Sequence, residues 1–404
     1  MNKWFRPISG SVHSPGRLSP RRWRITLVLA LLGSACSTPK LPRPTGGAVT
    51  SSRSDAGTHG LGRRRPTLVR ADENSVAFDR RESPAARAED EPTAVSCGDS
   101  LLKIHFYDVA QGLAVLVDLP DGRHILVDTG DEFHRPGCGE VCERADNHLL
   151  ADLEHDLHGD PISMIWITHQ HSDHLGGAHE VMGKFATRLY VDNGRELEKG
   201  EVRRAHDAAR TAGAALAIVD PEHAQAPLRS TENVKLTAIV PSTWPDACKH
   251  DANDCSIGLR IDYCQSSVLF TGDAEADEES AMDVHGHATL LQVGHHGSNT
   301  STSKPFLTKV APKYAVISAG KPGEGTNRTY CHPRAVTVEA LTAQLGGPSS
   351  KSINAFDGNV ACKKSGPGHW HDVRSSDRLW ATERDGDIVL TTTGDGAFVR
   401  ETPP

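Results

Sequence analysis

Apolar and polar residues alternate over short segments between residues 101 and 391, and Gly, Pro or Asp interrupts the alternation between segments. Alternation over about four to eight residues is typical of β-strands. The first three predicted strands should form an antiparallel meander, and 256–270 and 378–391 should form hairpins. The strands predicted in this way are 103–109, 112–119, 123–127, 165–168, 188–191, 234–240, 256–262, 267–270, 288–293, 314–318, 378–382 and 387–391.

Helical periodicity appears between these strands, at 147–156, 177–185, 196–212, 305–310 and 334–344. The strands therefore fall into two runs, each interspersed with helices. Such an order favours an α/β fold of two sheets packed face to face, with helices outside, over a doubly wound sheet.

The chain before residue 97 has a different composition. Residues 37–96 are rich in Ser, Pro, Arg, Gly and Ala and lack apolar periodicity. Such a segment buries too little apolar surface to offset its ordering entropy, so we expect a disordered tether there. The folded domain then covers 97–404, which is long enough for one substantial core.

An apolar run at 25–32 follows a cluster of arginines and predicts an export signal over residues 1–36. The run is short for a membrane span and suits a signal peptide. Small residues before Cys36 resemble a bacterial lipobox, in which the cysteine is lipidated. Because Leu32 lies one position too early, cleavage after Ala35 and an unprocessed anchor are alternatives. We expect an exported cell-envelope lipoprotein, with lipid as its only membrane attachment, or a secreted protein.

The net charge of −8 hides an asymmetry along the chain. Residues 1–70 carry 13 basic residues and one acid, whereas 71–404 carry 31 basic and 51 acidic residues, a net charge of −20. A domain with this negative charge lacks the basic surface by which proteins bind nucleic acid over many phosphates. A small-molecule or nucleotide-type substrate is therefore favoured, with at most short contacts to longer nucleic acid. The sequence does not indicate an oligomeric state.

Cysteine usage supports export. Eight cysteines remain after Cys36, and an even number in an oxidising compartment allows up to four disulfides. Their connectivity does not follow from the sequence. Cys138 and Cys142 could alternatively bind a metal, but no second pair with matching spacing follows them.

The strongest chemical signal follows the apolar run that ends at Thr168. His169, His171, Asp173 and His174 form the pattern H-x-H-x-D-H, and Gly176-Gly177 closes it. Imidazole and carboxylate are the ligands that suit zinc and related ions. Four such side chains on one loop are enough to begin two adjacent metal sites.

Several motifs in order resemble the metallo-β-lactamase superfamily, and specifically the hydrolase domain of ComEC-type DNA-uptake proteins. The match covers about 101–395. The residues that carry it are Phe106–Gly112 (similar to F-x-D-V-G-Q-G), Leu126–Gly130 (L-I-D-T-G), Thr168–Gly177, Leu269–Asp273 (L-L-T-G-D), Val293–Ser298 (V-P-H-H-G-S), Asn327–Pro333 (N-x-Y-x-H-P with one residue added) and Thr382–Gly386.

The resemblance implies a metallo-β-lactamase-like αββα sandwich and a site that holds one or two Zn²⁺ ions, with Mn²⁺ or another divalent ion as alternatives. His169 and His171 would bind one ion, Asp173 and His174 the other, and Asp273 would bridge them. The last ligand would be His295, ranked above His296. Asp173 and Asp273 would be the catalytic carboxylates beside a metal-bound hydroxide.

Weaker candidates surround this set. Asp128 would orient a ligand imidazole, or simply form a turn. Asn327 and His332 belong to a matching motif, and His332 would contact substrate. Residues 298–303, beginning at Ser298, could present donors to an anion. N-capping of the next helix by Ser303 is an equally good interpretation.

The chain also departs from the family pattern. Ala110 and Leu113 replace the usual Gly and acid, and Gln292 replaces a lysine. No convincing third histidine for the first ion is visible among His206, His223 and His250. Asn253-Asp254 resembles an Asn-rich stretch of the family without a certain role. His285–His287 and His369–Asp372 read as surface features.

The function expected is an exported metal-dependent hydrolase, most simply a phosphodiesterase of nuclease type. The alternatives are a lactam, lactone or thioester hydrolase on the same fold, and an exported binding protein without activity. The complete ligand set argues against the last.

Overall fold

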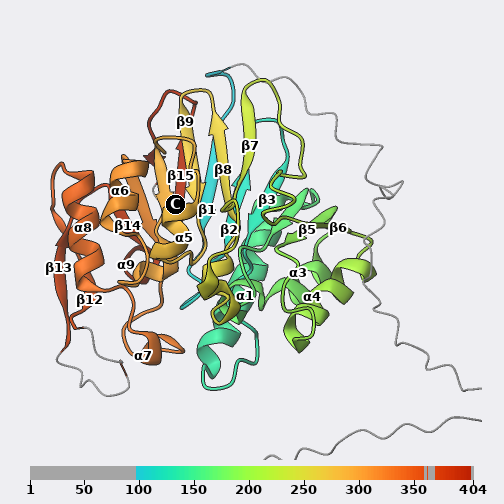
Figure 1. Ribbon diagram of the computed structural model, residues 1–404, viewed down its shortest axis with the longest axis horizontal. Coiled ribbons are helices and arrows are strands. Elements are labelled where there is room, and N and C mark those ends of the chain that lie inside the picture. Colours follow the sequence, from blue (N-terminus) through green and yellow to red (C-terminus); the bar gives the residue numbers. More distant parts are fainter. Residues whose placement is uncertain (1–96, 359–361, 363–368, 402–404) are drawn as a thin grey trace, which may run out of the picture. The chain divides into compact units, whose positions relative to one another are not determined.

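The structure is a computed structural model that describes residues 97–358, 362 and 369–401 (Figure 1). The expected signal peptide, tether and Cys36 lie outside these residues. Within the described part of the chain, none of the helices has the length and hydropathy that a membrane span requires.

Two mixed sheets form the centre of the domain, as the order of elements predicted. The first has eight strands in the order β16-β15-β1-β2-β3-β4-β5-β6, and the second has six in the order β14-β11-β10-β9-β8-β7. The first contains β1 Leu102–Phe106, β2 Val115–Asp118, β3 His124–Val127, β4 Met164–Trp166, β5 Leu189–Asp192, β6 Ala215–Ile218, β15 Ile388–Thr392 and β16 Val399–Arg400. The second contains β7 Val234–Ile239, β8 Gly258–Tyr263, β9 Ser266–Phe270, β10 Leu290–Gln292, β11 Tyr314–Ile317 and β14 Leu379–Ala381.

Helices cover the outer face of each sheet, so the domain has four layers (Figure 1). On the first sheet lie α1 Glu140–Leu157, α3 Ala178–Lys184 and α4 Gly200–Thr211. On the second lie α6 Lys304–Val310 and α8 Ala335–Leu345. The predicted sandwich class is confirmed. Shorter helices are α2 Ser172–Leu175, α5 Ala276–Ala281, α7 Asn327–Tyr330 and α9 Thr382–Asp385.

The alternation of side chains along each strand accounts for these layers. In β4, Met164 and Trp166 belong to the core between the sheets, whereas Ile165 packs under the helices. Both faces of such a strand are buried, which is why its sequence reads as a continuous apolar run.

The predicted meander β1-β2-β3 and the predicted hairpin β8-β9 are both observed. From β3 to β6 the first sheet is parallel. From β9 through β10 and β11 to β14 the second sheet is parallel as well. Parallel pairing collects the carboxyl ends of these strands at one edge of each sheet, where α/β folds place their ligands.

The predicted hairpin over 378–391 is wrong. β14 pairs with β11 in the second sheet, and β15 pairs with β1 in the first. The alternation identified both strands correctly, but their partners are distant in the sequence, and α9 turns the chain from one sheet to the other.

Other elements were missed. β6 and the two-stranded sheet of β12 Lys351–Phe356 and β13 Trp370–Ser375 were not predicted. α1 begins well before residue 147 because its buried stripe continues through Asp146 and Cys142, residue types that do not mark an apolar face.

All eight cysteines of the folded domain pair, as expected. The disulfides are Cys97–Cys264, Cys138–Cys142, Cys248–Cys255 and Cys331–Cys362. The metal interpretation of Cys138 and Cys142 is therefore not supported.

His105 is buried between two carboxylates on the helix-covered face of β1. Its Nε2 lies 2.9 Å from Asp118 Oδ2 and its Nδ1 lies 3.1 Å from Asp156 Oδ2. Burial alone would lower the pKa of His105, but the hydrogen bonds and charges of the two aspartates raise it to about 9.

A His105→Gln variant should therefore lose a pH-dependent part of the stability. Because the pKa of the folded state exceeds the ordinary value of 6.5, the imidazolium stabilises the fold fully below about pH 6.5. That contribution disappears as the pH rises through about 9. Urea denaturation should show that wild-type unfolding free energy falls by about 3 kcal/mol more than that of the variant over this window. The exposed His223→Gln variant is the control, and parallel profiles for wild type and His105→Gln would contradict the assignment.

Candidate metal centre

The candidate ligands lie at the carboxyl ends of parallel strands in both sheets. The segment His169–His174 follows β4 in the first sheet. Asp273 follows β9 and the pair His295-His296 follows β10 in the second sheet. Residues far apart in the sequence are thereby brought to one place.

A close contact between the sheets makes this convergence possible. The Ile257 N–H donates to Thr168 O at 2.8 Å, and Trp166 Nε1 donates to Ile257 O at 2.9 Å. Gly272 has a φ of 55°, and a Cβ there would lie 2.5 Å from the Thr168 side chain. Only glycine allows this approach, which brings Asp273 beside the histidine loop.

Two groups of potential ligands share His174. One contains His169, His174 and Asp273, and the other contains Asp173, His174 and His296. His174 Nε2 lies 3.3 Å from Asp273 Oδ1 and 3.2 Å from His296 Nε2. His296 Nε2 lies 3.4 Å from Asp273 Oδ2 and 3.6 Å from Asp173 Oδ2.

These separations suit a metal ion. Ligand atoms around a tetrahedral Zn²⁺ lie roughly 3.3–3.5 Å apart, as bond lengths near 2.1 Å require. In addition, Asp273 Oδ1 is buried and accepts no hydrogen bond, so a lone pair is available to a cation. Burial would raise the pKa of Asp273, but the charges of His174, His296 and His295 hold it well below its usual range. The donor set therefore fits the expected divalent ions.

Asp128 fixes the orientation of the shared histidine. Its Oδ2 lies 2.7 Å from His174 Nδ1, and its Oδ1 accepts from the Thr168 N–H at 2.7 Å. This contact leaves His174 Nε2 facing the other ligands, and it is the arrangement by which outer carboxylates orient metal-binding imidazoles.

The order of His295 and His296 differs from the prediction. His296 joins a ligand group, and its Nδ1 lies 2.8 Å from Ser318 O, which turns Nε2 toward the site. His295 Nε2 is 3.7 Å from Asp273 Oδ2, and its Nδ1 lies 3.3 Å from Glu275 Oε1. Both histidines have left-handed φ angles, 49° and 51°. Such a conformation costs energy and persists only where the surrounding structure holds it, most often at functional sites; it is not visible in the sequence.

The first two histidines of the loop lie side by side, as a shared ion would require, and His169 also joins a second set of ligands. His169 lies with His174 and Asp273. His171 is half-buried and lines the cavity, with its Nδ1 3.1 Å from His169 Nε2. Asn253 lies close by: its Nδ2 is 3.4 Å from His295 Nε2, and its buried Oδ1 has no hydrogen-bond partner. His206, for which the sequence offers no convincing context as a third histidine ligand, lies 2.7 Å from Asp192 instead.

The weaker candidates have different positions. Ser298 Oγ contacts Thr300 within its own loop, and Ser303 caps α6 by accepting from Phe306 N at 3.3 Å. Asn327 holds the loop of His332 by accepting from its N–H at 2.8 Å and donating to its carbonyl at 2.7 Å.

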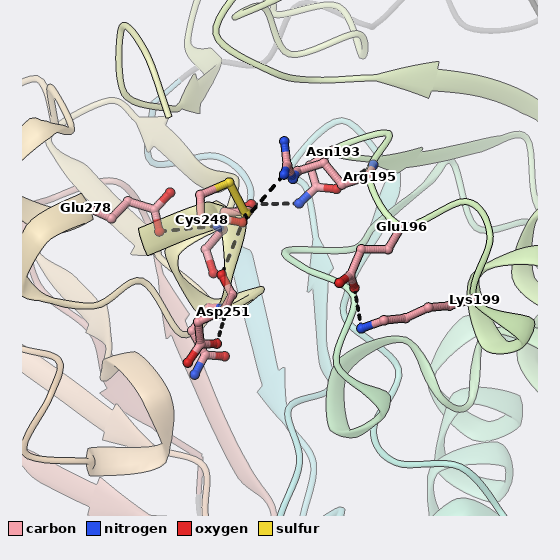
Figure 2. Close-up of a disulfide and its surroundings, with 10 residues drawn as sticks. Asn193, Arg195, Glu196, Lys199, Cys248, Asp251 and Glu278 are labelled. Carbon is pink, nitrogen blue, oxygen red and sulfur yellow. Dashed lines mark hydrogen bonds and ion pairs between the residues drawn. A yellow bond between two sulfur atoms is a disulfide. The ribbon is translucent and has the colours of Figure 1, made fainter. Parts of the chain in front are cut away.

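A cavity of about 640 Å³ opens over the ligands. Apart from the candidate ligands, its lining includes three cationic and three acidic side chains, namely Arg135, Lys199, Arg334, Glu196, Glu201 and Asp251. One wall is formed by the loop that Cys248–Cys255 closes. Figure 2 shows this disulfide beside Asn193, whose side chain donates to Cys255 O at 2.7 Å, with Asp251 and the Glu196–Lys199 pair nearby.

Several residues of this site escaped the sequence analysis, namely Asp131, Arg135, Gln170 and Tyr330. Asp131 follows the strand-end motif at 126–130 directly, which was a usable signal. Burial and the charge of Asp173 raise the pKa of Asp131 to about 7. Arg135 lies on a loop, where no periodicity marks a site, whereas Tyr330 ends α7 within the motif Asn327–Pro333, which was a usable signal.

Gln292 explains one departure from the family pattern. Its Oε1 accepts from the N–H groups of Thr271 and Gly272, at 2.9 and 3.0 Å. Its Nε2 donates to the carbonyls of Gly272 and Val293, at 3.1 and 2.7 Å. The amide thus ties the strand end that carries Asp273 to the strand end that carries the two histidines.

Residues 107–321 match the family model of the metallo-β-lactamase superfamily. The chain belongs to this superfamily. The chain is thus a metal-dependent hydrolase of this superfamily. Membership implies that its site binds a divalent metal ion.

Curated relatives confirm the resemblance to the hydrolase domain of ComEC-type proteins. Recombination protein 2 of Haemophilus influenzae is 30% identical over 218 residues, which cover 53% of this chain and 24% of that protein. ComE operon protein 3 of Bacillus subtilis is 28% identical over 262 residues, 61% of this chain and 31% of that protein. Competence protein ComA of Neisseria gonorrhoeae is 28% identical over 268 residues, 63% and 33% respectively. The chain thus spans about a quarter to a third of these relatives.

Solved structures of similar fold are more distant. A point mutant of CmlA beta-hydroxylase has a TM-score of 0.41 at 14% identity, covering 75% of this chain and 55% of that chain. The metallo-beta-lactamase fold protein YhfI from Bacillus subtilis has a TM-score of 0.36 at 12% identity, covering 54% and 86%. Both scores are low, so the fold assignment rests on the family match and the sheet order.

Replacing Gln292 should destabilise the junction between β9 and β10. Gln292→Leu leaves two buried N–H donors without partners, at about 1–3 kcal/mol each. Gln292→Lys should also destabilise, because an ammonium group cannot accept a hydrogen bond. Unfolding free energies from urea denaturation would measure both effects, with the exposed Gln265→Leu as control. A Gln292→Lys variant as stable as wild type would contradict this account.

Proposed function

We propose that the chain is an exported phosphodiesterase of nuclease type that acts on short or single-stranded nucleotide substrates. Zn²⁺, in one or two sites, is the proposed metal, because the donor set is rich in imidazole; Mn²⁺ is the alternative. The observation that carries the proposal is that two ligand groups share His174 and face one cavity, whose lining includes cationic side chains beside the ligands.

The ligand arrangement supports a pair of adjacent ions. Asp273 offers one oxygen toward His174 and the other toward His296, as a bridging carboxylate would. Asp128 and the Ser318 carbonyl hold Nδ1 of these two imidazoles, so that Nε2 remains for metal. When bound, such ions supply Lewis acidity and lower the pKa of water, and two-metal sites serve phosphatases and nucleases.

The substrate class is inferred from charge. Arg135, Lys199 and Arg334 line the cavity of a body whose net charge is otherwise strongly negative. A few cations beside the ligands suit one or two phosphates, whereas a long duplex would need many more. The names of the relatives refer to competence and recombination, processes that involve DNA, which agrees with a phosphodiester substrate.

Metal content and substrate assays test this function. The oxidised full chain should bind a divalent ion and hydrolyse bis(p-nitrophenyl) phosphate, but not a cephalosporin, a lactone or a thioester. His174→Ala and Asp273→Asn should lower kcat/KM at least about 100-fold, because several kcal/mol of charge stabilisation are lost. Metal analysis should show reduced occupancy in both.

His223→Ala, on the surface, is the matched control, and circular dichroism verifies folding. Removal of metal by a chelator should abolish activity, and Zn²⁺ or Mn²⁺ should restore it. Equal activity of wild type and Asp273→Asn, or turnover of the lactam alone, would refute the phosphodiesterase assignment.

Export is supported by the four disulfides, which are typical of proteins outside the reducing cytosol. If Cys36 carries the lipid, Cys36→Ser should move the protein from the membrane fraction to the soluble exported fraction. Fractionation followed by immunoblotting measures this shift, and Cys97→Ser controls for loss of a cysteine. Unchanged membrane association of Cys36→Ser would rule out the lipid anchor.

A further inference from the structure

One wall of the cavity differs from the rest in having an aromatic and cationic character. It is formed by Arg135, from the loop between β3 and α1, and by Tyr330, at the end of α7. Arg135 Nη2 donates to the Tyr330 hydroxyl at 3.3 Å. A loop and a short helix whose contacting residues are 195 positions apart therefore meet beside the candidate metal centre.

Tyr330 is unusual in its exposure. Among the large hydrophobic residues that the structure describes, five are exposed: Leu101, Leu197, Tyr330, Val336 and Val399. Tyr330, at 36% exposure, is the aromatic one among them, and it alone of the five lines the cavity. An aromatic ring kept at the mouth of a polar cavity offers a stacking surface.

His332 provides a second, independent indication of a ligand. It is 5% exposed, it lines the same cavity, and its buried Nδ1 has no hydrogen-bond partner. Its ring lies 6.3 Å from that of Tyr330 and 5.2 Å from that of His295. A buried polar nitrogen without a partner is costly, whereas a polar group of a substrate would satisfy it.

The wall is also firmly held. Asn327 clamps the backbone of His332. Arg334 donates to the Tyr330 carbonyl at 3.1 Å, and its guanidinium lies 5.0 Å from the centre of the Phe356 ring. Such a preformed surface reduces the ordering cost of binding.

Arg135 lies in the field of the Asp131, Asp173 and Glu201 carboxylates, yet its side chain keeps N–H groups for an anion. Its Nη1 is 3.5 Å from Asp131 Oδ1, longer than a normal hydrogen bond. Its side chain is 24% exposed. The guanidinium can therefore turn its free N–H groups toward a phosphate, which it binds more specifically than an ammonium would.

We propose that Arg135, Tyr330 and His332 form a subsite for the nucleotide that flanks the scissile phosphodiester of a single-stranded nucleic acid. Tyr330 stacks on the base, Arg135 binds the flanking phosphate, and His332 Nδ1 bonds a polar group of that nucleotide. The strand must be single, because only an unstacked base can lie on the ring. This inference rests on the proposed function and names the substrate class of the same site.

Binding of a short oligonucleotide to the metal-loaded full chain tests the stacking. The probes are fluorescein-labelled phosphorothioate pentathymidylates, which resist hydrolysis, with normal or abasic residues. Tyr330→Leu should weaken binding of the normal probe about 10-fold, which equals about 1.4 kcal/mol and lies within the range for one stacked base. Tyr330→Phe, which retains the ring, should lose less than about 3-fold. The fully abasic probe should bind more weakly to wild type, and Tyr330→Leu should not weaken it further.

Salt dependence tests the role of Arg135. Arg135→Gln should weaken binding and reduce the slope of log K against log salt by about 0.7, as expected for one lost phosphate contact on a single strand. Arg135→Lys, which retains the charge, should keep the slope. A purely structural role of Arg135 would leave the slope unchanged in both variants. Binding of a pentauridylate should be weakened by Tyr330→Leu as much as binding of the pentathymidylate, because stacking does not require a particular sugar.

The outcomes separate this subsite from the proposed function. Equal losses for normal and abasic probes in Tyr330→Leu, or no binding of any probe to wild type, would overturn the subsite even if bis(p-nitrophenyl) phosphate is hydrolysed. Tyr330-dependent binding without hydrolysis of any diester would retain the subsite and refute the phosphodiesterase.

Discussion

The hydrogen bond between Asp128 and His174 is the contact on which the candidate metal centre depends. His174 belongs to both ligand groups, so its orientation determines whether either group can form. Asp128 follows β3, and it also accepts from the N–H and the hydroxyl of Thr168, at the end of β4. One carboxylate thus joins two strand ends and fixes an imidazole. The Asp128 carboxylate is fully buried, and without these hydrogen-bond partners its burial would destabilise the fold.

The second sheet must deliver its ligands to the same point, and small features of the sequence achieve this. Gly272 allows the chain to approach Thr168 closely. Gln292 then holds the ends of β9 and β10 together through four hydrogen bonds. The Gln292 amide bonds only backbone groups, so it sets the positions of the strand ends without contributing a ligand. Residue 292, where the family usually has Lys and this chain has Gln, is not a metal ligand. Its identity nevertheless affects the geometry of the site, because it holds the strand ends that carry the ligands.

The sequence was most informative where a local pattern carried the chemistry. The loop His169–His174 and the position of Asp273 could be predicted because each directly follows an apolar strand. The two-sheet architecture could be predicted because each strand and helix has its own local hydrophobic pattern, and the order of these elements along the chain indicates the architecture. The partners of β14 and β15 could not, because pairing with β11 and β1 is decided by packing between distant segments. His296 lies nearer than His295 to the other ligands because of a left-handed turn that residue types do not reveal.

The cavity wall was missed for a related reason, and the disulfides show how it is stabilised. Arg135 is on a loop and Tyr330 ends the one-turn helix α7, and neither segment shows a periodic pattern. Cys138–Cys142 follows the first of these segments closely, Cys331–Cys362 begins directly after Tyr330, and Cys248–Cys255 encloses Asp251 and Asn253. Loops on a surface pack little apolar area, so cross-links are an effective way to limit their conformational freedom. Three of the four disulfides are therefore located where the cavity needs fixed walls, while Cys97–Cys264 ties the start of the folded domain to the β8-β9 turn. An oxidising environment would consequently preserve the shape of the cavity more than the core of the sheets, which is already held by burial.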